Sequence, residues 1–520
     1  MLRTLLRKKE FWVILFIFLF GFLIRILFVI PANTIIGFDQ ARDLFSATTI
    51  FRDHHIAIIG PTAGNNLNLH HGVLFWYYMV VPLIIGKGNP IGVVIWNSFF
   101  NALAVVVLYF LGREVFKSKR VGVIAALVTA VSYYYVQFSG WLSNPTGTFF
   151  TLPVIFLGFW EYKTGKKWGL PLAFFFLGLT IQFELFFIYL IPTGIVAWII
   201  LRPKWPSFRL TVFSVFAFCL ATFSMIVTEI KFHFAGIQSI LFAGQFVGGT
   251  KSSNFFSLIL DFISKKWETF YLNFWPQNIR IGTLIGVFAV GLLIFEIFKE
   301  RKVRQRNLYI LLWFFSPAIM FFLGQHNAPW FYIGRPASAI LIGSYLISRI
   351  SEACHFVVKP NFLVALILLF VVGANLTAVK DSLGKGQALL EPDAASIMSD
   401  QLKAIDYTYI SSMEKPFEIN TLTNPLYVNA VWGYQYYWYG KQKYGHLPSF
   451  VGGDQLYPYN TLPKSNGKEQ YVYILIDTTN RIPTSYKIEI VDSANQISKL
   501  VEEKRFGGID VQKRIRFDKK

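Results

Sequence analysis

Cysteines and charged residues are both scarce in this sequence. The 520 residues include two cysteines, Cys219 and Cys354, which are far apart and lie in or beside apolar runs. Neither a disulfide framework nor a CxxC metal site is therefore available. Charged residues make up 15% of the chain, whereas a soluble globular protein carries roughly a quarter. This shortage excludes an ordinary soluble globular protein.

Acidic residues are fewer than basic ones, 29 against 49, which gives a formal net charge of +20. An excess of this kind can indicate a nucleic-acid-binding protein. The basic residues, however, fall largely in short connectors between apolar runs, where they orient a membrane protein by the positive-inside rule. These connectors are 113–120, 163–167, 202–209, 299–306 and 349–359. We therefore expect no nucleic-acid partner.

Long apolar runs dominate the first 380 residues of a chain that is 54% apolar and 18% aromatic. Runs of this length can cross a bilayer as helices. They lie at 11–31, 91–112, 121–138, 146–162, 168–183, 185–201, 210–229, 281–298, 308–323, 336–350 and 361–378. The first is too long for a signal-peptide core and has no small-residue cleavage site, so we interpret it as an uncleaved span. About eleven spans, with a cytoplasmic N-terminus and a C-terminus outside, keep all five basic connectors cytoplasmic.

One apolar segment does not fit this count. Residues 71–86 are apolar enough to span, but an additional span there would turn every basic connector outward. We interpret this segment as a juxtamembrane or partly inserted helix on the outer face, with Trp76, Tyr77 and Tyr78 at the interface. The prediction is thus an α-helical polytopic membrane module over 1–380, with long outer loops at 32–90 and 230–280.

After residue 380 the composition changes to that of a soluble protein, and we predict a small α/β domain over 381–520 outside the membrane. The expected elements are a helix at about 393–412, an apolar stretch at 416–422, an aromatic segment at 427–444, a strand at Tyr471–Ile476, and a hairpin of 497–506 and 509–517 joined by Gly507-Gly508. The aromatic segment is expected to pack on the membrane module, with sugar stacking as the alternative. No internal repeat is evident, which weakens an inverted-repeat transporter.

Acidic and basic side chains gather just after the first span. In a helix that begins near Gly37, Asp39 and Asp43 lie one turn apart on the same face, and Arg42 flanks both. A carboxylate pair with a guanidinium beside an apolar span can hold an anion and accept a proton. The alternative is structural: Asp39 stabilises the helix N-terminus, and Arg42 pairs with a neighbour on a hydrated surface.

The same outer loop carries two histidine pairs, His54-His55 and His70-His71. A long outer connector of this kind is more than topology requires, and such loops are usually functional. Adjacent histidines on a helix or strand point in different directions, and neither a cysteine nor an HExxH motif accompanies them, so we predict no metal site. A divalent cation is possible but is not required by the sequence.

Several short motifs occur together along the chain. They are Gly37-Phe-Asp39-Gln-Ala-Arg-Asp43, Gly60-Pro61, His71-Gly72, Ser143-Asn144-Pro145 and Gln182-Phe-Glu184. With these motifs the chain resembles the GT-C glycosyltransferases of the protein-mannosyltransferase and aminoarabinose-transferase-like superfamily (family 39). The resemblance covers roughly residues 1–380 as architecture, with specific motifs at about 35–75, 140–146 and 180–186. It implies a GT-C fold that moves a sugar from a polyprenyl-phosphate carrier at the outer membrane face.

In that family the acidic residue of the first outer loop is the catalytic base, which implies this role for Asp39. Many relatives have Asp-Glu at this point, whereas this chain has Asp39-Gln40. One carboxylate suits the chemistry, because a sugar phosphate leaves as a stable anion and needs no acid, unlike the alcohol that leaves in glycosidases. Direct displacement by an acceptor hydroxyl would invert the anomeric centre. The expected acceptor is a lipid, a glycan or a protein, and membrane lipids are the other partner.

Further candidates lie in the outer connectors, where cations could hold the carrier phosphate. The substrate-binding candidates are Arg42, Asp43, His71, Gln182, Glu184, Lys231, His233, Arg280, His326 and Arg335. For the cations the alternative is contact with lipid headgroups or a structural ion pair. For Gln182 and Glu184 it is satisfaction of broken helix ends.

Two other classes of function compete with a transferase. A transporter or flippase of lipid-linked saccharides should show ionisable residues or broken helices at mid-membrane, whereas the polar clusters here gather in outer loops. A structural or assembly protein with an outer binding domain would leave the cluster at Asp39–Asp43 without a purpose. We therefore predict a membrane glycosyltransferase.

Overall fold

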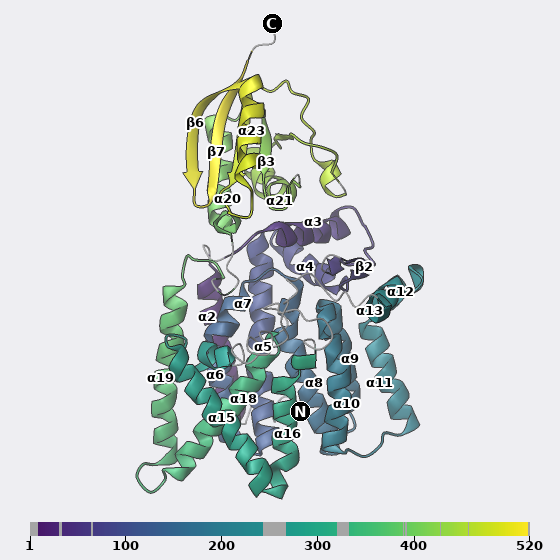
Figure 1. Ribbon diagram of the computed structural model, residues 1–520, viewed down its shortest axis with the longest axis vertical. Coiled ribbons are helices and arrows are strands. Elements are labelled where there is room, and N and C mark those ends of the chain that lie inside the picture. Colours follow the sequence, from purple (N-terminus) through teal and green to yellow (C-terminus); the bar gives the residue numbers. More distant parts are fainter. Residues whose placement is uncertain are drawn as a thin grey trace.

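The computed structural model describes residues 9–30, 34–63, 66–242, 267–319, 332–387, 389, 393–426, 428–455 and 457–517. A large helical bundle fills one end of the molecule, and a small α/β part made of C-terminal residues stands on the other end (Figure 1). A thin outer layer lies between them (Figure 1). It contains α3 (Phe38–Arg52), β1 (Thr62–Ala63), β2 (Asn66–His70) and α4 (Leu74–Ile85).

The helices of the bundle follow the predicted apolar runs. They are α2 (Lys9–Val29), α5 (Pro90–Phe116), α8 (Thr148–Lys163), α9 (Gly169–Phe183), α10 (Leu190–Leu201), α15 (Ile279–Lys299), α16 (Arg301–Phe315), α18 (Arg335–Ala353) and α19 (Pro360–Asp381). The short helices η1 (Asn144–Gly147) and η2 (Leu185–Tyr189) lead into α8 and α10. In the described part of the chain, α2, α5, α15 and α19 are each long and apolar enough to cross a membrane. The protein is therefore a polytopic membrane protein.

Two of the predicted spans are bent pairs of helices. α6 (Lys119–Val131) meets α7 (Tyr133–Ser139) at 49°, and α11 (Phe208–Ala221) meets α12 (Phe223–Lys231) at 71°. At the first bend, the Tyr133 N–H donates to Asn375 (2.8 Å) and the Tyr135 N–H donates to the Ser132 hydroxyl (3.2 Å). Side chains thus satisfy backbone groups that the bend frees. With each pair counted once, six spans in the described residues pass by length and composition, and the count of about eleven stays a prediction.

The basic segment 299–306 is not a loop, which corrects the sequence analysis. Helix α16 begins at Arg301, directly after Glu300, because Arg, Lys and Gln side chains have high helix propensity. The end of the predicted run 308–323 lies outside the described residues. Residues 71–86 contain the expected helix, α4, which lies in the outer layer beside α3 (Figure 1). Whether α4 enters the membrane stays a prediction.

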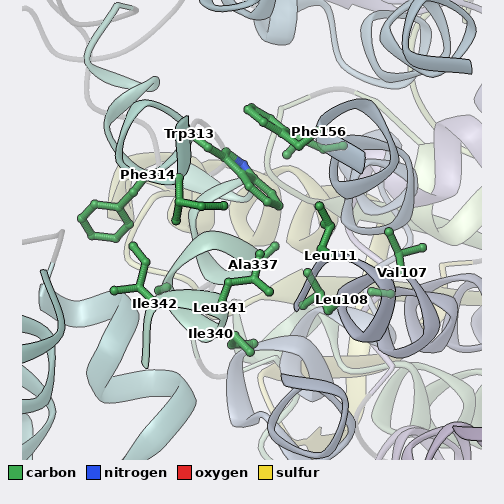
Figure 2. Packing of buried hydrophobic residues seen from close by; sticks show 14 of the residues in the cluster. Val107, Leu108, Leu111, Phe156, Trp313, Phe314, Ala337, Ile340, Leu341 and Ile342 are labelled. Atoms are coloured by element: carbon green, nitrogen blue, oxygen red, sulfur yellow. The ribbon is translucent and has the colours of Figure 1, made fainter. Parts of the chain in front are cut away.

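Large apolar side chains fill the core of the bundle (Figure 2). Leu108 of α5, Phe156 of α8, Trp313 of α16 and Leu341 of α18 are all buried there. The rings of Phe156 and Trp313 stack with centroids 4.1 Å apart. In a bilayer such contacts stabilise through close packing, since the lipid tails are as apolar as the side chains. The core therefore fixes the bundle that supports the outer layer.

The C-terminal part is a five-stranded sheet with the strand order β4-β3-β5-β7-β6. Its strands are β3 (Phe417–Leu422), β4 (Ser449–Phe450), β5 (Tyr471–Asp477), β6 (Ser498–Phe506) and β7 (Ile509–Arg516). Its helices include α20 (Met398–Ser411), α21 (Ala430–Gln435), η6 (Tyr436–Gly440), α22 (Lys441–Tyr444) and α23 (Thr484–Ile497). Strands β3, β4 and β5 are parallel, whereas β7 runs antiparallel to both β5 and β6. The predicted hairpin through Gly507-Gly508 is confirmed; α23 and β4 were not predicted.

The backbone just before α3 is bonded to the C-terminal part. The Ile36 N–H donates to the Ser396 carbonyl (2.7 Å), and the Met398 N–H donates to the Thr34 carbonyl (3.0 Å). The Gln401 side chain of α20 donates to the Ile36 carbonyl (2.8 Å). The C-terminal part thus fixes the start of α3.

The aromatic segment packs on the outer layer, as expected. Trp432, Tyr434 and Tyr436 are fully buried. The rings of Tyr434 and Phe45 in α3 pack edge to face, with centroids 6.0 Å apart. The Tyr434 hydroxyl donates to the Gly88 carbonyl (2.7 Å). These rings are structural, because their faces are covered by protein.

Candidate active site

Helix α3 begins at Phe38, as the sequence predicts. The N–H of Gly37 donates to Gln40 Oε1 (3.1 Å), so the Gln40 side chain closes the first turn. The residue that follows Asp39 therefore has a structural use at the helix start. Asp39 stands in this first turn, where the helix dipole favours a negative charge.

Asp39 and Arg42 form an ion pair. Arg42 Nη1 lies 2.7 Å from Asp39 Oδ1, and the guanidinium also packs on the ring of Phe38, 5.6 Å from its centroid. The Asp39 side chain is 61% exposed. The carboxylate is thus held in position on one side and accessible on the other, as a general base requires.

Asp43 is buried on the other side of Arg42. Only 1% of its side chain is exposed, and its Oδ1 accepts from Arg42 Nε (2.9 Å) and Trp76 Nε1 (3.0 Å). Burial raises the pKa of Asp43, and the Arg42 charge opposes this shift. Arg42 therefore contacts both carboxylates, as the sequence predicts. The sequence did not predict that Asp43 is buried while Asp39 is accessible.

A cavity of about 810 Å³ opens between the bundle, the outer layer and the C-terminal part. Asp39 lies in its wall. The outer layer and the bundle contribute Phe38, Asp39, Gln40, Tyr134, Phe138, Trp141, Ser143, Glu268, Thr269, Leu272 and Tyr332, and the C-terminal side contributes Leu389, Asp393, Ser396, Asn424, Pro425 and Arg481. A volume of this size suits a small-molecule or sugar site.

Sequence reasoning missed the far side of this cavity. Asp393, Asn424 and Arg481 come from loops of the C-terminal part, and Glu268 and Trp141 come from the bundle side. The sequence offered one indication: Asn424 and Arg481 lie in the loops that follow two predicted apolar stretches, 416–422 and 471–476. Nothing local linked these loops to a position near residue 39.

Three of the sequence motifs meet in one buried cluster beside the cavity. Asn144 Nδ2 donates to Glu184 Oε2 (3.0 Å), and His71 Nδ1 lies 3.3 Å from Glu184 Oε1. The Leu185 N–H donates to the same His71 nitrogen (3.4 Å). Burial raises the pKa of Glu184 to about 8 and lowers the pKa of His71 to about 3. At neutral pH the cluster is therefore a protonated acid beside a neutral imidazole.

These two pKa shifts predict how stability depends on pH. Between pH 4.5 and about 8, native Glu184 keeps a proton that the unfolded chain releases, so its contribution falls as pH rises. Between pH of about 3 and pH 6.5, the unfolded chain binds a proton that His71 does not bind in the native protein. The contribution of His71 to stability therefore rises with pH. The two trends oppose each other up to pH 6.5. Above it only Glu184 acts, and the free energy of unfolding should decline by roughly 2 kcal/mol toward pH 8.

Glu184→Gln is expected to abolish this decline, because the amide cannot ionise and still accepts from Asn144. Thermal unfolding of the purified protein at pH 6.5 and pH 8 measures the effect. Glu300→Gln removes an exposed carboxyl between α15 and α16 and serves as the control that keeps the decline. An unchanged pH dependence in Glu184→Gln would show that Glu184 is already ionised at pH 6.5.

The remaining candidates are dispersed. Gln182 is buried and donates to Ser224 (2.8 Å). Lys231 and His233 are exposed at the end of α12, and Arg280 is exposed in the first turn of α15. Arg335 is buried at the start of α18 over the ring of Tyr332, 4.0 Å from its centroid. His326 lies outside the described residues, and the substrate roles of all these residues stay predictions.

The adjacent histidines of the first outer loop point to different partners. His70 Nδ1 lies 3.1 Å from the Gly60 carbonyl, whereas His71 faces Glu184. Among the described residues, no three His, Cys, Asp or Glu side chains gather closely enough to hold a metal ion.

An apolar groove runs along the bundle between α9, α10 and α11. It consists of two hollows of about 660 and 250 Å³ that share Ile191 and Phe218. The larger hollow reaches Trp205 and Pro206 in the α10–α11 connection, at the end of the bundle far from the C-terminal part (Figure 1). The smaller reaches His70, His71 and Gly72 in the outer layer. The groove thus leads from one end of the bundle to the His71–Glu184 cluster.

Comparisons with known proteins agree with this architecture. Residues 70–228 match the family model described as dolichyl-phosphate-mannose-protein mannosyltransferase, and no curated protein matches the sequence. The fold is similar to that of ArnT from Cupriavidus metallidurans in the apo state, with a TM-score of 0.61 and 12% identity over 96% of this chain and 97% of that chain. The Archaeoglobus fulgidus oligosaccharyltransferase in its apo form gives a TM-score of 0.49 and 12% identity over 90% of this chain and 69% of that chain.

Proposed function

We propose that this chain is a membrane glycosyltransferase of the GT-C type, and that it moves a sugar from a polyprenyl-phosphate carrier to an acceptor hydroxyl. The family match over residues 70–228 and the fold shared with ArnT support this proposal. The observation that carries the proposal is the place of Asp39. Its accessible carboxylate stands in the wall of a cavity of about 810 Å³. The carboxylate is held by Arg42, and the start of its helix is bonded to the C-terminal part.

The proposed reaction is a single displacement. The acceptor oxygen attacks the anomeric carbon from the side opposite the phosphate while Asp39 takes the hydroxyl proton. The bond between the anomeric carbon and the phosphate oxygen breaks, and the polyprenyl phosphate leaves as an anion. Because this leaving group needs no proton, one carboxylate is sufficient. The product has the inverted anomeric configuration.

The apolar groove supports a lipid-linked donor. A polyprenyl chain is a long hydrocarbon, and the groove between α9, α10 and α11 offers apolar side chains along the bundle. At its outer end stand His70 and His71, and the exposed Lys231 lies near them, packed on Phe232, whose ring stacks on His70. In this proposal the polyprenyl chain of the donor lies in the groove. Its sugar-phosphate headgroup, held at a fixed depth, reaches the cavity past the His71–Glu184 cluster.

The proposed reaction takes place on the outer face. The basic connectors favour a cytoplasmic N-terminus and a C-terminal part on the other side. The cavity with Asp39 lies under the C-terminal part, so it would open on the extracytoplasmic side, where a carrier delivers its sugar without a nucleotide.

A donor panel tests the proposal. Purified protein in lipid nanodiscs is incubated with radiolabelled polyprenyl-phosphate sugars, and release of polyprenyl phosphate is scored with and without acceptors. We expect one class of lipid-linked sugar to be consumed, and nucleotide sugars to be left intact. Consumption of a nucleotide sugar alone would overturn the lipid-carrier donor, and consumption of neither would overturn the transferase.

A further inference from the structure

We infer that Arg25, a charged residue inside the first span, is a positioning residue for sugar transfer, because it holds the bend from which α7 enters the cavity wall. This inference rests on the proposed function and adds to it a residue that the mechanism above does not use. Arg25 lies in α2, one turn before Val29, and is fully buried. A charge inside a membrane span is costly and most often has a function.

The Arg25 guanidinium is bonded to uncharged oxygens of three helices. Its Nη1 donates to the Gly21 carbonyl of α2 (2.8 Å) and to the Ala130 carbonyl of α6 (2.8 Å). Its Nη2 donates to the Thr129 carbonyl of α6 (3.0 Å), and its Nε donates to Asn101 Oδ1 of α5 (2.8 Å). The planar guanidinium presents its donors in a fixed geometry, so it ties α2 to α5 and α6.

The two carbonyls of α6 that accept from Arg25 belong to the last turn of that helix, where carbonyls lack partners in the helix itself. In an unbroken helix the Thr129 carbonyl would accept from the N–H of Tyr133, four residues later. That N–H instead donates to Asn375 of α19 (2.8 Å). Arg25 therefore supplies the donors, and Asn375 an acceptor, that a straight helix would have in its own backbone.

The bend directs α7 into the wall of the candidate active site. Tyr134 and Phe138 lie one turn apart on α7, with ring centroids 4.7 Å apart, and both line the cavity of about 810 Å³. Trp141, which follows α7, also lines it, and its carbonyl accepts from Asn97 Nδ2 (3.1 Å). Asn97 and Asn101 are one turn apart on the same face of α5. This face is thus bonded to the guanidinium at the start of α7 and to the backbone beyond its end.

A shift of α7 would change the shape of the cavity without altering the general base or the groove. A misplacement of about 1 Å can lower a rate by roughly 10²-fold, since the reacting atoms must be aligned. Among the described residues that line the groove proposed for the polyprenyl chain, none belongs to α7. Loss of Arg25 should therefore slow transfer and leave binding of the carrier nearly unchanged.

Arg25→Met tests the inference, with Arg306→Met as the matched control. Arg306 of α16 is also largely buried in the bundle, with 12% of its side chain exposed, and its Nη2 donates to Glu296 (3.0 Å) and Tyr345 (3.0 Å). None of these three residues lines the cavity. The full-length protein in lipid nanodiscs is assayed for the single-turnover rate at saturating donor and acceptor, for binding of polyprenyl phosphate, and for hydrogen exchange of the amides of 133–139, which reports local opening.

We expect Arg25→Met to lower the single-turnover rate by about 10²-fold, to speed hydrogen exchange in α7, and to bind polyprenyl phosphate about as tightly as the wild type. Arg25→Lys keeps the charge but not the planar fork of donors, so it should restore part of the rate and part of the protection of α7. It takes the place of Arg25→Met if that variant does not fold. Arg306→Met should unfold at a lower temperature yet keep the wild-type rate and the wild-type exchange of α7.

A wild-type rate or an unchanged exchange of α7 in Arg25→Met, or in Arg25→Lys where only that variant folds, would overturn the inference. An equal loss of rate in Arg306→Met would also overturn it, because the loss would then come from general destabilisation. If the wild-type protein consumes no donor, the proposed function fails and the role in transfer fails with it. Faster exchange of α7 in Arg25→Met would then still support the hold of Arg25 on the bend, and unchanged exchange would overturn that as well.

Discussion

Asp39→Asn is expected to lower the rate of sugar transfer by about 10²–10⁴-fold, the usual contribution of a positioned general base. Asparagine has the shape of aspartate and can still accept from Arg42, so the position of α3 is kept. It cannot take the hydroxyl proton. The rate is measured in single turnover at saturating donor and acceptor, so that binding does not limit it. Donor binding should be close to that of the wild type.

Asp53→Asn is the matched control for this prediction. Asp53 follows the other end of α3, is paired with Arg52, and is far less buried than Asp43. It should transfer sugar at the wild-type rate. A normal single-turnover rate in Asp39→Asn would show that Asp39 is not the general base. A loss in both variants would mean that the charge of the outer layer, rather than one carboxylate, sets the rate.

Arg42→Ala is expected to destabilise the protein by about 3–5 kcal/mol, because it leaves the buried Asp43 carboxylate without its cation. The Trp76 N–H remains as a donor, but it carries no charge. The effect is measured by thermal unfolding in detergent at pH 7. Since burial raises the pKa of Asp43, the lone carboxyl takes up a proton more easily than an exposed one. The loss of stability should therefore shrink as pH falls.

The double variant Arg42→Ala, Asp43→Asn separates charge from packing. It removes both members of the pair and should recover most of the lost stability. Arg52→Ala, which breaks the more exposed pair with Asp53, should cost less than about 1 kcal/mol. If the double variant is no more stable than Arg42→Ala, the guanidinium acts through its contact with Phe38 and not through Asp43.

The bundle could be predicted from the sequence because hydropathy is a local property. Every predicted apolar run contains helix in the described residues, and the Gly507-Gly508 turn identified the last hairpin. The bend at Ser132 could not be predicted, since it depends on Asn375, which is 242 positions from Tyr133 along the chain. The helix that begins at Arg301 was not predicted, because the basic residues that orient a membrane protein do not determine whether their backbone is helical.

For the site, the sequence identified the first outer loop and the pairing of Arg42 with both aspartates. The resemblance added Asn144 and Glu184, which meet His71 in one cluster. The sequence did not predict that Asp39 is exposed and Asp43 buried, because exposure depends on Trp76 and on the packing of α4. The C-terminal wall of the cavity could not be predicted, because Asp393 and Arg481 come near Asp39 only when the C-terminal part packs on the outer layer.

The bonds between the start of α3 and the C-terminal part also concern the order of synthesis. Ile36 and Gln401 are 365 positions apart, and they come together only when the ribosome has made the last part of the chain. Until then the first outer loop lacks the backbone partners that set the direction of α3. An unfinished polypeptide therefore has the bundle and its groove but an unanchored Asp39. Under the proposed function, sugar transfer would therefore require the C-terminal part to be made and docked first.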